Sequence, residues 1–356
     1  MIQHRPTDRS GCNQRWLGAF LHVAGLLLVA ANASGEPKVE TVLRELNRPT
    51  SVAIQPKTGA IVVSEAGAGR IVKVLEDQKT RILIAGKVSD RASEYNEGVL
   101  ALAFFDQETL LVADGGFREA GDIVHTFTLA DTDDTLDYPD DAQREIDVGT
   151  PDKESTDRIR GIALGKSALF AAGDTRRRGG VARAQIDGTK FGKLELLVTS
   201  ATNGEARTWA AIAIGPRGEV VVGPFSKDKI SNDRSLVFFH GTTGRTLLEL
   251  QSDLSNIIAL AYHPKTNLLY ALDLGSEATS KDPAIAAGLY RIDRSQTADF
   301  SRAGTTRIAT LERPTAMAFA PDGTLYVTVL GAVTVKEPAK AGQLLKLTLQ
   351  ETAPKK

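Results

Sequence analysis

Hydrophobic and small residues alternate in a short motif that recurs six times along the chain. In each copy an alanine stands between two large apolar residues, and a small residue precedes this triplet. The triplets are Val52-Ala53-Ile54, Leu102-Ala103-Phe104, Ile162-Ala163-Leu164, Ile212-Ala213-Ile214, Leu260-Ala261-Tyr262 and Met317-Ala318-Phe319. Alternation with a period of two is typical of a β-strand whose two faces meet different surroundings. We therefore expect six equivalent strands, with small side chains where several sheets crowd together.

A turn and further apolar runs follow each triplet. Four of the six turns combine Pro with Gly or Asn, as in Pro56-Lys57-Thr58-Gly59, which is the chemistry of a hairpin turn. Second strands are expected at 60–63, 110–113, 168–172, 219–222, 268–272 and 324–328. Third strands are expected at 69–75, 121–129, 180–186, 235–240, 288–292 and 343–349. Fourth strands are expected at 80–84, 144–148, 194–198, 245–250 and 305–311, and the sixth copy has none of its own.

Repeats of this length predict a stacked or radial array of small sheets. Residues 39–46 precede the first copy and would supply the strand that the sixth copy lacks. Such a closure removes strand edges that would otherwise be exposed. The prediction is an all-β fold, a six-bladed β-propeller closed by the N-terminal strand of the mature chain.

The first residues of the chain have the pattern of an export signal. Residues 1–16 are polar and basic, residues 17–30 are almost entirely apolar, and Ala31-Asn32-Ala33 offers the small residues that a signal peptidase needs. We expect residues 1–33 to be removed as a signal peptide. Residues 34–356 would then form a single exported domain, periplasmic or extracellular. An uncleaved anchor is the alternative, but the apolar run is shorter than the roughly 20 residues of a membrane span.

Composition narrows the class of partner. The chain has 43 Lys and Arg residues and 44 Asp and Glu residues, which gives no charge bias toward nucleic acid or an anionic membrane. Its single cysteine, Cys12, lies in the predicted signal peptide, so the mature chain would hold together without disulfides. We expect a monomer that binds no nucleic acid and has no membrane span after cleavage.

The first and last copies carry a family resemblance. Residues 48–54 read Arg-Pro-Thr-Ser-Val-Ala-Ile, residues 61–71 read Ile-Val-Val-Ser-Glu-Ala-Gly-Ala-Gly-Arg-Ile, and residues 321–328 read Pro-Asp-Gly-Thr-Leu-Tyr-Val-Thr. These segments resemble the units of NHL-repeat six-bladed β-propellers, a wider group that includes gluconolactonase-like and soluble sugar dehydrogenase propellers. The resemblance covers nearly all of residues 39–349 and implies the same ring.

The resemblance also implies a candidate site on one face of the ring. There, the corners between second and third strands lie beside the residues just before each innermost strand. The second strands are expected to end at Glu65, Asp114, Asp174, Pro224, Asp273 and Val329. Five positions before three of the anchor alanines stand Arg48, Arg158 and Arg313. The four acids could bind Ca²⁺ or another divalent metal, or the hydroxyls of a sugar. Alternatively, each acid ties the corner to the next blade and pairs with a neighbouring arginine.

Two charged segments add candidates. Arg176, Arg177 and Arg178 follow Asp174 and could bind a carboxylate or phosphate in bidentate fashion, although a solvated basic run is the simpler interpretation. The acidic residues of the connection between the second copy's third and fourth strands are Asp131, Asp133, Asp134, Asp137, Asp140 and Asp141. This connection lacks the Gly and Glu of an EF-hand loop, so we expect a solvated loop on the opposite face.

Catalytic motifs are sparse. The histidines after residue 33 are His125, His240 and His263, and none stands where a general base on the candidate face would be needed. The gluconolactonase-like pattern has a metal-binding Glu before the first blade, whereas this chain has Asn47-Arg48-Pro49-Thr50. Whether the protein is an enzyme therefore stays open.

Three functions remain. The leading hypothesis is a binding module that recognises a sugar, a polymer or a protein through the long corners at 224–232, 275–287 and 331–341. The alternative is an enzyme acting on sugars or lactones, with Glu65, Asp114, Asp174 and Asp273 around the axis. The third is a structural role in an envelope assembly.

Overall fold

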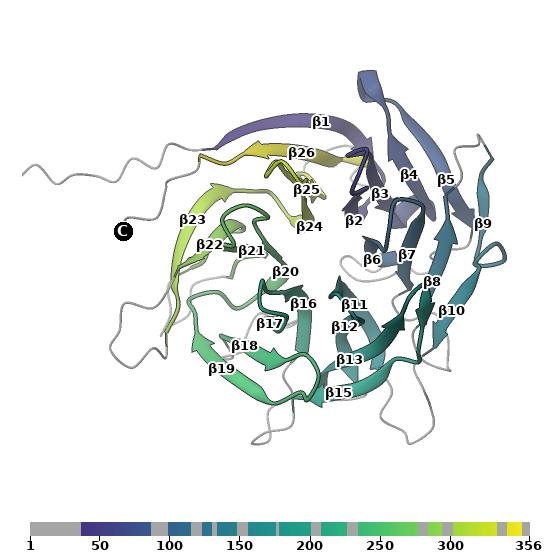
Figure 1. The fold of residues 1–356 in the computed structure, drawn as a ribbon. Helices are drawn as coiled ribbons and strands as arrows, with labels where there is room; N and C mark the ends of the chain where they lie inside the picture. Colours follow the sequence, from purple (N-terminus) through teal and green to yellow (C-terminus); the bar gives the residue numbers. More distant parts are fainter. Residues whose placement is uncertain are drawn as a thin grey trace, which may run out of the picture. The chain divides into compact units, whose positions relative to one another are not determined.

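Six β-sheets surround a central axis in the computed structural model (Figure 1). It describes residues 37–86, 99–114, 123–129, 134–147, 156–175, 178–200, 208–225, 234–276, 284–293, 302–332 and 340–350. The chain divides into Met1–Gly35 and Glu36–Lys356, and all described residues belong to the second unit. Their helices are two single turns, Ala66–Ala68 (η1) and Glu76–Gln78 (η2), and no described helix is long and apolar enough to cross a membrane. The predicted all-β, six-bladed propeller is confirmed.

Each blade starts with an innermost strand at the end of its sheet nearest the axis. Blade 1 contains β2 (Pro49–Ile54), β3 (Ile61–Glu65), β4 (Arg70–Val74), β5 (Thr80–Gly86) and β9 (Leu136–Tyr138). Blade 2 contains β6 (Val99–Phe104), β7 (Thr109–Asp114), β8 (Ile123–Thr128) and β10 (Arg144–Asp147). Blade 3 contains β11 (Thr156–Leu164), β12 (Ala168–Thr175), β13 (Arg178–Asp187), β14 (Lys190–Phe191) and β15 (Glu195–Thr199).

The remaining blades have four strands each. Blade 4 contains β16 (Thr208–Ile214), β17 (Glu219–Phe225), β18 (Ser235–His240) and β19 (Thr246–Gln251). Blade 5 contains β20 (Ile257–Tyr262), β21 (Leu269–Asp273), β22 (Gly288–Asp293) and β23 (Gly304–Thr310). Blade 6 contains β24 (Pro314–Phe319), β25 (Leu325–Val329), β26 (Gly342–Thr348) and β1 (Lys38–Leu46), so it joins strands from both ends of the described chain.

β1 is bound into blade 6 by backbone pairing and by packing. It pairs antiparallel with β26, from Lys38 opposite Thr348 to Leu46 opposite Gly342. Leu43 and Leu46 are buried in the cluster between blades 6 and 1. Of the apolar residues in this strand, Val42, Leu43 and Leu46 therefore pack against blade 1, whereas Val39 is exposed.

Every innermost strand carries a bulge at the same place. The register between first and second strands shifts three residues before the anchor alanine in all six blades. The extra residues are Thr50, Leu100, Arg160, Ala210, Ile258 and Thr315. A bulge bends its strand and increases the local twist. Because it recurs in every copy, it is part of the repeat.

The small residue before each triplet lies where neighbouring blades approach closely. A Cβ added to Gly161 would stand 2.8 Å from the carbonyl oxygen of Ala210 in the next blade. In blade 1 the same position is Ser51, whose buried hydroxyl oxygen accepts a hydrogen bond from the Leu102 N–H of blade 2 at 3.0 Å. Large side chains fill the rest: six clusters of described, buried residues lie between successive blades. Burying each such side chain stabilises the fold by about 1.5–3 kcal/mol.

The acidic connection of blade 2 differs from the expectation of a loop. Leu136–Tyr138 forms β9, which pairs in parallel with β5 of blade 1. Tyr138 is buried against the rings of Phe127 and His125, with centroids 5.9 and 4.9 Å away. Asp134, Asp137, Asp140 and Asp141 are exposed as expected, and Asp131 and Asp133 lie outside the described residues. Leu136 and Tyr138 therefore allow part of an acidic segment to form a strand that connects blades 1 and 2.

Candidate functional site

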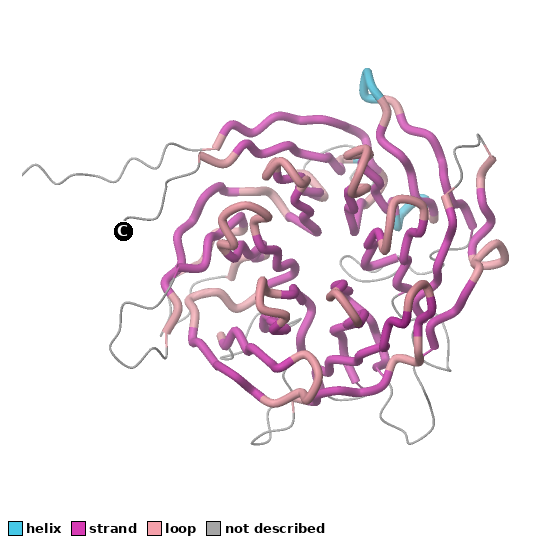
Figure 2. Tube along the Cα trace, in the orientation of Figure 1, coloured by secondary structure: helices cyan, strands magenta, loops and turns pink. Residues whose placement is uncertain are grey.

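The two faces of the ring carry different connections. The short turns between first and second strands surround the axis on the face toward the viewer in Figure 2. The predicted site lies on the other face, at the corners between second and third strands. Of these corners, the structure does not describe residues 115–122, 176–177, 226–233, 277–283 and 333–339. Arg176, Arg177 and most of the three long corners therefore lie outside the described residues.

Glu65 ends β3 as predicted, and its carboxylate is used within blade 1. The residue is 1% exposed. Its Oε1 accepts the backbone N–H of Asn47 at 2.7 Å, and its Oε2 accepts Arg70 Nε at 2.6 Å. Asn47 lies just before the innermost strand of the same blade. The acid thus ties the corner to its own blade and pairs with the third strand, rather than with the next blade or a neighbouring blade's arginine.

Asp273 ends β21 and plays the same part in blade 5. It is fully buried, and its Oδ2 accepts the backbone N–H groups of Ser255 and Asn256 at 3.2 and 3.0 Å. Its Oδ1 accepts the N–H of Gly275 at 2.6 Å. Burial raises the pKa of the Asp273 carboxyl, while the three backbone donors and the charge of Arg234 act in the opposite direction. Both described rim acids therefore hold the residues that lead into their own innermost strand.

Of the other two predicted acids, only Asp114 occupies the position equivalent to Glu65 and Asp273. Asp114 ends β7 opposite Val99, in the register of Glu65 and Asp273. In blade 3 the residue in that register is Gly173, opposite Ile159. The first two strands continue beyond it until Thr156 pairs with Thr175, and Thr175 also pairs with Arg178 of the third strand. Asp174 is one residue beyond the predicted position, within β12.

Arg158 and Arg178 lie in strands rather than in a corner. Arg158 is within β11, opposite Asp174, and Arg178 is the first residue of β13. The strands of blade 3 are longer than the sequence pattern predicted, which moves both residues into the sheet. The side chains of Asp114, Asp174, Arg158 and Arg178 lie outside the described part of the structure.

Arg48 and Arg313 occupy matching positions in the neighbouring blades 1 and 6. Each precedes a proline, with φ of 51° and 52°, and each is half-buried. Their carbonyl oxygens accept the backbone N–H groups of Ala66 and Leu330 at 3.2 and 3.0 Å. The equivalent corner bond in blade 5 runs from Leu274 to Asn256 at 3.0 Å. These bonds fix the backbone of each arginine beside its own corner.

Hydroxyl groups stand two residues after each of these arginines, at the bulges. The Thr50 hydroxyl lies 2.9 Å from that of Ser64, and the Thr315 hydroxyl donates to Thr328, whose Oγ1 is 2.8 Å away. Both threonines are half-buried, whereas Ser64 and Thr328 are buried. Two adjacent blades therefore place an arginine and a pair of hydroxyls at the same part of the rim.

The described residues do not fit a divalent metal on this face. Glu65 and Asp273 are buried, and every oxygen of their carboxylates already accepts a hydrogen bond. Among the described side chains, no group of three or more His, Cys, Asp or Glu residues could hold a metal ion. Calcium prefers several convergent oxygen ligands, and this part of the rim does not supply them.

The histidines organise structure away from this rim. Nδ1 of His240 and Nδ1 of His263 each accept the backbone N–H groups two and three residues later, at 3.3 and 3.2 Å respectively. His125 is buried beside Tyr138, with its Nδ1 3.9 Å from Glu145 Oε1. None is placed as a base toward the rim.

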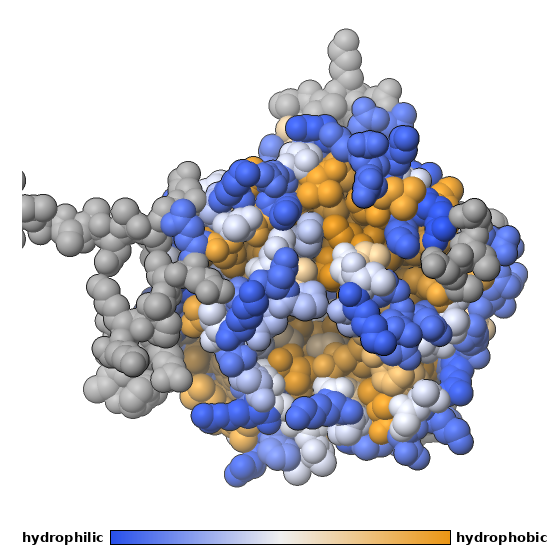
Figure 3. Space-filling view, turned by 45° about the horizontal axis from the view of Figure 1, so that its top comes forward, coloured by the Kyte–Doolittle hydropathy of each residue, from blue (hydrophilic) through white to orange (hydrophobic). Residues whose placement is uncertain are grey.

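Two grooves between blades, on the face of the first-to-second-strand turns, were not predicted from the sequence. One lies between blades 1 and 2 and has a volume of about 530 Å³; the other lies between blades 3 and 4 and has about 880 Å³. In Figure 3, which tilts the ring from the view of Figure 1, apolar surface lies in hollows bordered by hydrophilic side chains. The sequence signal for the first groove is a pair of cations on neighbouring strands, Lys73 and Arg81.

Comparison with known proteins supports the fold of the chain and does not assign it an activity. No protein-family model matches the chain, and no curated protein matches it. Its structure is similar to a gluconolactonase from Xanthomonas campestris, with 12% identity, a TM-score of 0.56 and coverage of 90% of this chain and 93% of that one. It is also similar to the soluble aldose sugar dehydrogenase of Escherichia coli, with 14% identity, a TM-score of 0.55 and coverage of 88% and 100%.

A third similar structure is the hydrazine synthase of Kuenenia stuttgartiensis, with 18% identity, a TM-score of 0.51 and coverage of 80% and 75%. The neighbours thus include the gluconolactonase-like and sugar dehydrogenase propellers that the sequence resembles. At these identities the likeness shows the fold alone, because propellers carry many unrelated functions.

Proposed function

We propose that the chain is an exported binding module that recognises an acidic saccharide on the face of the second-to-third-strand corners. The observation that carries this proposal is that the acidic rim residues are buried, whereas the basic and hydroxyl-bearing ones are partly exposed. Glu65 and Asp273 are the two predicted rim acids whose side chains are described, and both are buried and hydrogen-bonded within their own blades. The half-buried groups at the junction of blades 1 and 6 instead include the guanidinium groups of Arg48 and Arg313 and the hydroxyls of two threonines.

The chemistry of these groups suits a sugar that carries a carboxylate. A guanidinium has five N–H donors in a fixed plane, so it can keep an existing partner and still bind a carboxylate with two parallel bonds. The hydroxyls of Thr50 and Thr315 can exchange hydrogen bonds with the hydroxyls of a sugar ring. The backbone around Arg48 and Arg313 is already held by corner bonds, which reduces the ordering cost of binding.

Export rests on the N-terminal pattern of a basic segment, an apolar run and small residues. The alternative is an enzyme acting on sugars or lactones, which the gluconolactonase and dehydrogenase neighbours support only through their fold. A metal-dependent version would need ligands other than Glu65 and Asp273.

Calorimetric titration with a galacturonic acid oligomer and with a neutral glucose oligomer of equal length tests the proposal. The acidic oligomer should bind and the neutral one should not. The double variant Arg48→Gln, Arg313→Gln should weaken binding at least about tenfold, which corresponds to roughly 1.4 kcal/mol. Arg245→Gln, an exposed arginine in a turn on the other face, is the matched control and should bind like the wild type.

Equal binding of both oligomers, or of the wild type and the double variant, would overturn this assignment. Hydrolysis of gluconolactone above the spontaneous rate, raised by added Ca²⁺, would favour the enzyme instead.

A further inference from the structure

The groove between blades 1 and 2 is lined by two cations from neighbouring strands. Across blade 1, Val62 of β3 pairs with Lys73 of β4, and Lys73 pairs with Arg81 of β5. Residues directly opposite one another share a face of the sheet and lie about 4.5–5.5 Å apart at Cβ. Both cationic side chains line the groove and are half-buried. Like charges directly opposite destabilise a sheet, so this pairing needs an explanation.

The residues equivalent to Lys73 in the other blades show how the repeat accommodates a cation at this position. The third-strand residue in register with the anchor alanine is Lys73, Thr126, Arg183, Phe238, Arg291 or Lys346. Four of the six are therefore cations. In blade 3 the fourth-strand partner of Arg183 is Glu195, and in blade 6 the partner of Lys346 is Glu40. Each of these cations faces an acid.

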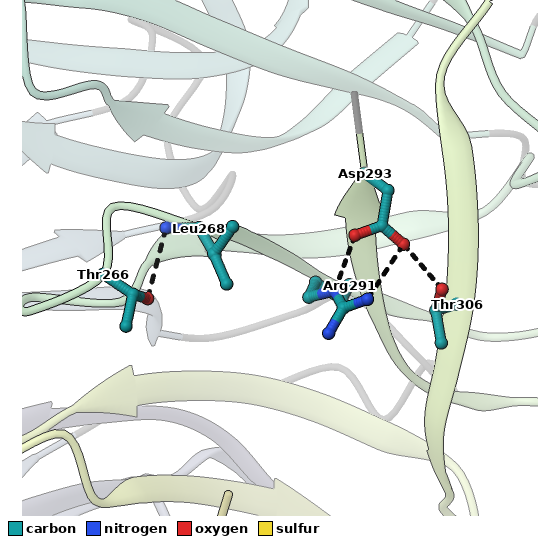
Figure 4. A network of polar contacts seen from close by, with 5 residues as sticks. All are labelled: Thr266, Leu268, Arg291, Asp293 and Thr306. Carbon is teal, nitrogen blue, oxygen red and sulfur yellow. Dashed lines mark hydrogen bonds and ion pairs between the residues drawn. The ribbon is translucent and has the colours of Figure 1, made fainter. Parts of the chain in front are cut away.

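Blade 5 neutralises its cation in a second way (Figure 4). Arg291 Nε donates to Asp293 Oδ1 at 2.6 Å, and its Nη2 donates to Oδ2 at 3.2 Å. The fourth-strand partner, Thr306, donates its hydroxyl to the same carboxylate at 2.6 Å. Blade 1 departs from these three blades, because its third-strand cation is paired with a second cation. Lys73 forms no ion pair or hydrogen bond with the described residues.

The groove around Lys73 and Arg81 has the other features of a small-molecule site. Its apolar lining includes Leu83 and Phe104, and its one acid, Glu108, is exposed. The side-chain amide of Gln55 donates to the carbonyl oxygen of Gln107 and so links the turns of the two blades. Ligand sites typically combine an apolar lining with a few convergent polar groups and a volume of roughly 300–1,000 Å³. The volume of about 530 Å³ falls in this range.

We propose that this groove binds a small organic anion, a carboxylate or phosphate monoester with an apolar group. The anionic oxygens lie between the Lys73 ammonium and the Arg81 guanidinium, and the apolar group lies against Leu83 and Phe104. Arg81 supplies planar donors and Lys73 a compact charge, a combination that suits either oxyanion. This site is on the face opposite the proposed saccharide surface, so either proposal can fail without the other.

Calorimetric titration in a phosphate-free buffer tests the site with phenyl phosphate, benzoate, inorganic phosphate and phenol. Phenyl phosphate or benzoate should bind, and whichever binds identifies the anionic group. Inorganic phosphate should bind more weakly because it lacks the apolar part, and phenol should not bind because it lacks the charge at neutral pH.

Two lysine variants separate a site from general surface charge. Lys73→Gln should weaken binding at least about tenfold, as expected for loss of a charged partner. Lys346→Gln, at the same position of blade 6 where Glu40 is the partner, should leave it unchanged. Without ligand, Lys73→Gln should melt at the same or a higher temperature than the wild type, because it removes the repulsion from Arg81. The proposal is overturned if no organic anion binds, if phenol binds as tightly, or if the two lysine variants weaken binding equally.

Discussion

The carboxylate of Glu65 gives the sharpest test of whether the rim acids serve the fold or a ligand. Glu65→Gln keeps the size and shape of the side chain but replaces one oxygen by an NH₂ group. The remaining oxygen can still accept the Asn47 N–H, which lies 2.7 Å from Glu65 Oε1 in the wild type. The new NH₂ group then faces Arg70 Nε, which in the wild type donates to Glu65 Oε2 at 2.6 Å. The change therefore removes the ion pair and sets one donor against another.

The expected magnitude follows from burial and charge. A hydrogen bond to a charged group contributes about 1.5–3 kcal/mol. The Glu65 side chain is 2% exposed but that of Arg70 is 35% exposed, so the guanidinium can turn to water and the cost falls in the lower half of this range. We expect Glu65→Gln to lower the free energy of unfolding by about 2 kcal/mol. Arg70→Gln leaves a buried carboxylate without its cation and should cost about 3 kcal/mol.

Urea unfolding followed by circular dichroism measures these values for the two single variants and the double variant. Because the double variant retains neither charge, its loss should be smaller than the sum of the single losses by roughly 1–2 kcal/mol. The melting temperatures of all four proteins should be the same with Ca²⁺ as with a chelator. The reasoning is refuted if Glu65→Gln is as stable as the wild type, or if Ca²⁺ stabilises the wild type and not this variant.

Three further predictions concern the ring itself. Leu46→Ala should lower the free energy of unfolding in urea by about 3 kcal/mol, because Leu46 is 2% exposed between blades 6 and 1, whereas Val39→Ala in the same strand, at a residue 45% exposed, should cost less than about 1 kcal/mol. Partial burial acts to raise the pKa of Asp106 but backbone N–H groups lower it overall, and a backbone N–H also lowers that of Asp322. The stabilisation by these two carboxylates is therefore complete above their unfolded-state pKa of about 4 and is lost as the pH falls below it. On acidification, the melting temperature of the double variant Asp106→Asn, Asp322→Asn should therefore fall less than that of the wild type. Tyr138→Ala should release β9 from β5, which hydrogen exchange will show as faster exchange confined to residues 134–147 and the facing strand.

The fold could be predicted from the sequence because the repeat states it six times. A strand pattern that is ambiguous in one copy is fixed by its position in the other five, and β18 begins and ends at the predicted residues, 235 and 240. The pairing of β1 with β26 could be expected for a similar reason: one copy lacked an outer strand, and one apolar segment lacked a blade.

The site could be predicted less well, because it depends on features that the repeat does not carry. The register of Asp174 was wrong by one residue, since nothing in the local pattern shows that the strands of blade 3 continue to Thr175. β9 was missed because Leu136 and Tyr138 are only two apolar residues in an acidic segment, and their partners belong to another blade. Local periodicity cannot report contacts of that kind.

The repeat nevertheless offers a physical criterion for separating structural from functional polar residues. Where two blades use a polar group in the same way, as Glu65 and Asp273 both bind the backbone leading into their own blade, the shared geometry is explained by the fold. Where one blade departs from an arrangement that several other blades share, the needs of the fold do not explain the departure. Lys73 opposite Arg81 is such a departure, because the equivalent cations of blades 3, 5 and 6 each meet an acid. A position that costs stability in the free protein is the one at which a ligand can restore it, so binding in that groove should raise the melting temperature of the wild type more than that of Lys73→Gln.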